Sequence, residues 1–168
     1  MSNKKTALIL LINAAMFTVL ILFHYSGASI KIMNANPFGA LALLITLIMF
    51  SSELTGVLTG VAVGIVLDSV AATPPGFNTA VLTLVSFGAT IVSHYLFNRN
   101  LKAALTLCLI AAAVYFAARW LVCFAFAGSV ESSINYLFRY AAPSAIYTAV
   151  LAVPFFYMEK RLFSVSGR

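Results

Sequence analysis

Long apolar runs, separated by short polar stretches, make up most of the chain. Six such runs follow one another at about 6–25, 37–52, 54–72, 77–97, 103–127 and 140–158. Most of them approach the roughly 20 residues that a helix needs to cross about 30 Å of hydrocarbon. The pattern predicts an all-α, polytopic membrane protein, with a bundle of six transmembrane helices in one integral membrane domain over residues 1–168.

The second run is the weakest of the six. Its apolar core, residues 38–50, would rise only about 20 Å as a helix, so a re-entrant segment that leaves five crossings is the alternative. The basic residues favour six crossings with both termini in the cytoplasm, since cytoplasmic loops carry an excess of Lys and Arg. That arrangement puts on the cytoplasmic side Lys4, Lys5, Arg99, Lys102, Lys160, Arg161 and Arg168. Five crossings would put at least one basic cluster outside.

Composition agrees with a membrane protein and changes how the charge is interpreted. Hydrophobic residues make up 62% of the chain and charged residues 8%, against about 25% charged in a soluble domain. The net charge of +6 therefore indicates membrane orientation rather than nucleic-acid binding. We interpret the tail at Glu159, Lys160 and Arg161 as a solvated segment with some attraction to anionic lipid.

A stripe of small residues marks the third run. Gly56, Gly60 and Gly64 recur at every fourth residue, and Asp68 continues the same step. On a helix this spacing stacks all four on one face, where small residues let another helix approach closely. The stripe therefore predicts close helix packing, with a carboxyl group on the packing face.

A turn follows the stripe. Pro74 and Pro75 stop the helix, since proline lacks an N–H and the residue before it avoids the α region. Asn78 then opens the next apolar run. The candidates for helix packing or partner contact are Gly56, Gly60, Gly64, Asp68, Pro75, Gly76, Asn78 and Arg119.

Asp68 and Arg119 are the two charged residues predicted to lie within the membrane away from span ends. A carboxyl group at depth costs roughly 2.5–3.5 kcal/mol to insert, so it normally faces protein and finds a partner. Counted from the outer ends of their spans, the two residues differ in depth by roughly 6 Å, which a long arginine side chain can bridge. Two interpretations stay open: a buried ion pair that fixes helix register, and a site for a ligand or partner.

Few residues are suited to catalysis or metal binding. The chain has four acidic residues, whereas paired-carboxylate hydrolysis and two-metal phosphoryl transfer need acids in clusters. His24 and His94 fall near predicted span ends on opposite sides of the membrane, so they do not share a metal. We therefore predict that the protein is not an enzyme and has no catalytic residue, cofactor or metal site.

Two stretches resemble a known family. Gly56–Gly64, Asp68 and the following Pro75-Gly76-Phe77-Asn78 look like the central signature of the rod shape-determining protein MreD family. The last run, with Ala142-Pro143-Ser144-Ala145-Ile146-Tyr147, Pro154 and the terminal Glu159-Lys160-Arg161-Leu162, resembles the C-terminus of that family. The layout of spans is also similar to that of the substrate-binding S components of energy-coupling-factor vitamin transporters.

The MreD resemblance implies a non-enzymatic assembly factor of the bacterial cell-elongation machinery, located in the inner membrane. It implies MreC as the direct partner, with indirect links to the MreB filament, the RodA glycosyltransferase and a class B penicillin-binding protein, and contact with membrane lipid. The alternative is an S component that binds a vitamin. Against that alternative, the first run lacks the alanine-xxx-alanine stripe with which those subunits typically dock.

Overall fold

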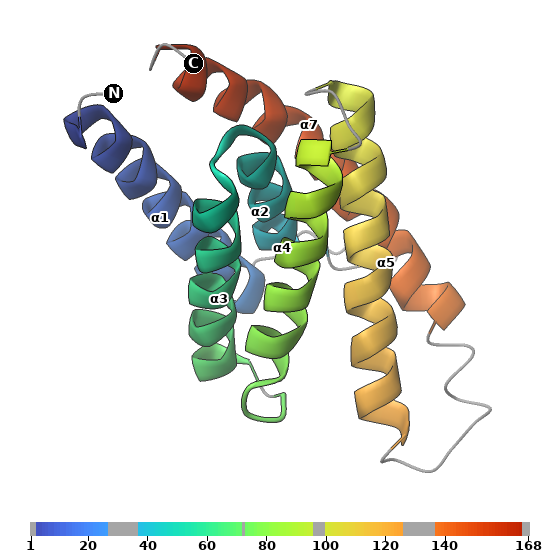
Figure 1. Ribbon diagram of the computed structural model, residues 1–168. Coiled ribbons are helices and arrows are strands. Elements are labelled where there is room, and N and C mark those ends of the chain that lie inside the picture. Colours follow the sequence, from blue (N-terminus) through green and yellow to red (C-terminus); the bar gives the residue numbers. More distant parts are fainter. Residues whose placement is uncertain (1–2, 27–36, 72, 96–99, 126–136, 166–168) are drawn as a thin grey trace.

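The computed structural model describes residues 3–26, 37–71, 73–95, 100–125 and 137–165, and in these ranges it is all-α (Figure 1). The helices are α1 (Asn3–Tyr25), α2 (Gly39–Phe50), α3 (Glu53–Val70), α4 (Phe77–Tyr95), α5 (Leu101–Ala125) and α7 (Ala142–Val165), the last preceded by a π-helical turn, η1 (Leu137–Ala141). Five are long and apolar enough to span a membrane. The predicted class, a multi-pass helical membrane protein, is confirmed at this level.

The short second run forms the centre of the bundle. All 12 residues of α2 are buried, and the helix packs against α1, α3, α4, α5 and α7. A helix that is hydrophobic all round is expected to be buried in this way. Its one polar side chain, Thr46, donates its hydroxyl hydrogen back to carbonyls of its own helix.

The helices alternate in direction along the chain. In Figure 1, α1 begins and α7 ends at one end of the bundle, where the short connection between α2 and α3 also lies. The turn between α3 and α4 lies at the opposite end. α2 begins near the middle of the bundle and rises toward the end that holds the two terminal helix ends, and Phe38 N–H fixes its start by donating to Thr148 Oγ1 of α7 at 3.0 Å.

The turn between α3 and α4 takes the shape that its sequence requires. Phe77 N–H donates to Pro74 O at 3.1 Å, and Gly76 has φ of +80°. A type II β-turn has this hydrogen bond, favours proline at its second position and needs positive φ at its third. Pro75 and Gly76 occupy those two positions. The turn is therefore rigid, and it sets α3 and α4 side by side.

The last helix extends further than the sequence predicted. The sixth run was expected to end near residue 158, but α7 continues to Val165 without a break at the charged residues. Phe163 is buried one turn beyond Glu159. The helix continues because its inner face still packs against the bundle, so the interpretation of 159–161 as a solvated tail is wrong for Glu159, which is fully buried.

Candidate functional site

The glycine stripe of α3 faces α4 of the same chain. A Cβ added to Gly64 would lie 2.5 Å from Thr79 Cα, and one added to Gly60 would lie 2.6 Å from Ser86 Cβ. A Cβ on Gly56 would lie 3.1 Å from Thr90 Oγ1. Glycine at these positions therefore lets the two backbones approach more closely than any other residue would allow, as in small-residue interfaces of membrane helices.

Two hydroxyl groups of α4 point at the glycines. Ser86 Oγ and Thr90 Oγ1 are buried, and neither has a hydrogen-bond partner among the described residues. Ser86 Oγ lies where a Cβ of Gly60 would be, so it faces the hydrogen that glycine carries there. Contacts of the Cα–H···O type recur at close helix interfaces and contribute perhaps 0.5–1 kcal/mol each. The geometry allows a contact of this kind between Gly60 and Ser86 Oγ.

Asp68 closes the interface by capping α4. Its carboxylate accepts hydrogen bonds from Asn78 N–H at 2.9 Å, from Thr79 N–H at 3.0 Å and from the Thr79 hydroxyl at 2.6 Å. The first N–H groups of a helix have no partner within the helix and form the positive end of its dipole. A negative carboxylate from the neighbouring helix satisfies two of them, so Asp68 acts as the N-cap of α4 from outside that helix.

Asn78 and Tyr115 extend this polar network to α5. The Asn78 side chain donates to Thr73 Oγ1 at 2.8 Å and accepts from the Tyr115 hydroxyl at 2.8 Å. Both Asn78 and Tyr115 are almost completely buried. The Arg119 guanidinium, one turn further along α5, interacts with the Tyr115 hydroxyl. The network thus ties α3, the turn and α4 to α5.

The ion pair between Asp68 and Arg119 stays a prediction. The hydrogen bonds that the Asp68 carboxylate accepts come from the start of α4. Asn78 and Tyr115 lie between the two in the chain of contacts. The depth estimate considered Arg119 as the partner of Asp68 and did not consider the N–H groups at the start of α4, which donate to the carboxylate.

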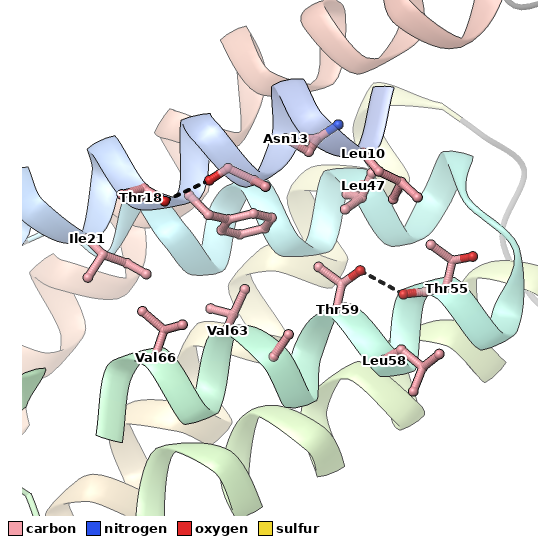
Figure 2. Close-up of a pocket in the computed structure, with 13 residues that line it drawn as sticks. Leu10, Asn13, Thr18, Ile21, Leu47, Thr55, Leu58, Thr59, Val63 and Val66 are labelled. Carbon is pink, nitrogen blue, oxygen red and sulfur yellow. Dashed lines mark hydrogen bonds between the residues drawn. The ribbon is translucent and has the colours of Figure 1, made fainter. Parts of the chain in front are cut away.

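A groove runs between α1 and α3, away from this network (Figure 2). Its volume is about 470 Å³, and Leu47 of α2 contributes to its lining. The threonine hydroxyls in its walls are satisfied: Thr18 donates to Ala14 O at 2.9 Å and Thr59 to Thr55 O at 2.7 Å. The walls are therefore effectively apolar, apart from Asn13 on α1.

Two buried polar residues were not among the sequence candidates. Glu159 is fully buried and Asn13 is 2% exposed. The helical spacing in the sequence could have identified Glu159 as buried. The buried face of α7 holds residues spaced by three or four: Ala145, Thr148, Ala152, Phe156, Glu159 and Phe163. Asn13 lies likewise between Ile9 and Phe17, at a spacing of four on α1.

Among the described residues, no group of three or more His, Cys, Asp or Glu side chains is placed to hold a metal ion. The sequence candidates between Gly56 and Asn78 instead pack, turn or cap helices. The comparisons with known proteins add no assignment, because no protein family, curated protein or solved structure matches the chain.

Proposed function

We propose that the chain is a non-enzymatic membrane scaffold of the bacterial cell-elongation complex, of the MreD type. One observation supports the proposal most. The residues that carry the resemblance, from Gly56 through Asp68 to Asn78, all belong to the α3–α4 hairpin, and each has a role in packing, turning or capping it. A signature made of such residues defines a rigid shape, as a scaffold that works through contacts requires.

Partners follow from the same resemblance. MreC is the proposed direct partner, and MreB, RodA and a class B penicillin-binding protein are linked through the complex. Membrane lipid surrounds the bundle, whose exposed faces carry large apolar side chains such as Leu11, Leu54 and Leu84. The proposal includes no cofactor, metal or nucleic acid.

The proposed orientation in the bacterial inner membrane places both termini in the cytoplasm and the α3–α4 turn outside. In a chain without its natural cysteines, a single cysteine at Pro75 is expected to react with an impermeant thiol reagent added to whole cells. A cysteine at Asn100, which precedes α5 at the other end, is expected to react only after the cells are opened. Labelling of Asn100 in whole cells would contradict six crossings.

The function is tested by complementation. We expect the chain, expressed in a rod-shaped bacterium depleted of its own MreD, to maintain rod-shaped cells. The chain is expressed together with the MreC of its own source as the matched condition. Round cells in that condition, despite normal amounts of both proteins in the membrane, would argue against the proposal.

A further inference from the structure

Glu159 is a buried acid that the proposed scaffold function does not explain. Both of its carboxyl oxygens are buried and have no hydrogen-bond partner within the described part of the chain. Phe156 and Phe163 flank it on α7, and the rings of both pack against Phe50 of α2 at 5.3 and 6.0 Å between centroids. A carboxylate without a donor is very costly in such surroundings.

Asn13 of α1 is the polar side chain beside this carboxyl group. Its amide nitrogen donates to Ile9 O at 3.1 Å, which fixes the orientation of the amide. Its carbonyl oxygen, Oδ1, is buried and also has no donor in the described ranges. Neighbouring α1 and α7 residues thus contribute three buried oxygen atoms that lack a hydrogen.

A single proton provides a partner for two of these three oxygen atoms and removes the buried charge. A neutral carboxyl group has one O–H donor, and by donating to Asn13 Oδ1 it satisfies that oxygen and one oxygen of Glu159 together. The cationic neighbours in sequence, Lys160 and Arg161, are exposed and lie on the outer side of α7. Glu159 lies on the opposite, inner face of the helix.

We propose that neutral Glu159 donates a hydrogen bond to Asn13 and that this pair is a latch that fastens α1 to α7. The buried side chains of α1 form one stripe, with Met16 and Leu20 packed partly beside it; the stripe holds Ile9, Asn13, Phe17 and Ile21. On the side of α3, α1 is separated from the bundle by the groove, and Asn13 lies in the groove wall (Figure 2). The latch therefore determines where α1 lies and how wide the groove is.

Two readouts test the latch in the full-length protein in detergent. The first is the thermal unfolding midpoint. Glu159→Gln keeps an N–H donor for Asn13 Oδ1, so we expect it to unfold within about 2 °C of the parent, whereas Glu159→Ala is expected to lose about 5 °C. Glu53→Gln, which neutralises an exposed acid on α3, is the control for charge and is expected to change nothing.

The second readout is the distance between spin labels on either side of the groove, at Leu10 of α1 and Leu58 of α3, both of which are exposed. The parent and Glu159→Gln are expected to give the same narrow distribution. Glu159→Ala and Asn13→Leu are expected to give a broader one, shifted to longer distances. Where a single variant does not accumulate, Asn13→Leu combined with Glu159→Leu removes both polar groups and is expected to restore the folded protein.

Three results would overturn the latch. Glu159→Gln as damaging as Glu159→Ala would mean that the carboxylate is charged and bound to a cation. Unchanged label distances in Glu159→Ala and Asn13→Leu would mean that the pair does not position α1. A double variant no more stable than the worse single variant would mean that the two side chains do not interact.

Discussion

Replacing Gly64 with alanine is expected to lower the free energy of unfolding by about 1–2 kcal/mol, the largest effect that we expect from a single added methyl group. The new Cβ would lie 2.5 Å from Thr79 Cα, a backbone atom that cannot turn away. Overpacking of this kind costs about 1–3 kcal/mol, and the better helix propensity of alanine offsets up to about 1 kcal/mol. Gly64→Leu is expected to prevent accumulation altogether.

Gly88 provides the matched control. It also lies within a helix, α4, but a Cβ added to it would meet nothing within 4 Å. Gly88→Ala is expected to leave the free energy of unfolding unchanged or to raise it by up to about 1 kcal/mol. Reversible unfolding in mixed micelles measures both variants, and equal effects of Gly64→Ala and Gly88→Ala would show that α3 and α4 do not meet at the stripe.

Gly60 allows a rescue that Gly64 does not. The obstacle to Gly60→Ala includes the side chain of Ser86, whose Cβ would lie 2.6 Å from the new methyl group. Ser86→Gly removes that side chain, so Gly60→Ala with Ser86→Gly is expected to be more stable than Gly60→Ala alone. Such a rescue would show that the stripe packs against α4 of this chain and not against MreC.

The second large effect is expected at Asp68. Asp68→Ala leaves two backbone N–H groups of α4 and the Thr79 hydroxyl without their acceptor. Loss of a helix cap costs about 0.5–2 kcal/mol, and we expect a value in the upper half of that range. Asp68→Asn retains one acceptor oxygen and is expected to lose about half as much. Ser69→Ala, at an exposed neighbouring position, is the control.

Double-mutant cycles separate the cap from an ion pair. Asp68→Ala and Thr79→Val remove the two ends of one hydrogen bond, so their effects are expected to be strongly non-additive. The contacts at Asn78 and Tyr115 link Asp68 to Arg119 indirectly, so the coupling between Asp68→Ala and Arg119→Ala is expected to be weaker. A larger coupling to Arg119 than to Thr79 would contradict the capping role.

The sequence predicted the fold class, the face of α3 that packs closely and the turn that follows α3. Apolar length is enough to identify spanning helices, and a spacing of four residues is enough to put the glycines on one face. The position of the turn followed from Pro74 and Pro75, whereas its type came from the structure. The neighbour of the glycine face could not be predicted, because spacing identifies a face but not the element that packs on it.

The roles of Asp68 and Glu159 were not predicted, and each for a physical reason. The role of Asp68 was missed because a cap contributed by a neighbouring helix depends on how the turn folds back. Glu159 was misinterpreted because Lys160 and Arg161 follow it, although its spacing from Phe156 and Phe163 places it on the buried face. The second run was expected to be the weakest span, and α2 is a 12-residue helix outside the five candidate spans; its uniformly apolar character places it at the centre of the bundle.

The scaffold proposal depends most directly on which proteins are bound to the chain in its native membrane. The test is to purify the tagged chain in mild detergent from the complemented, rod-shaped cells and to identify the bound proteins by mass spectrometry. We predict recovery of MreC, a bitopic protein with a periplasmic coiled coil, in amounts comparable to the bait. Recovery of paired ATPases with a bound vitamin, and no MreC, would contradict the scaffold and support the transporter component instead.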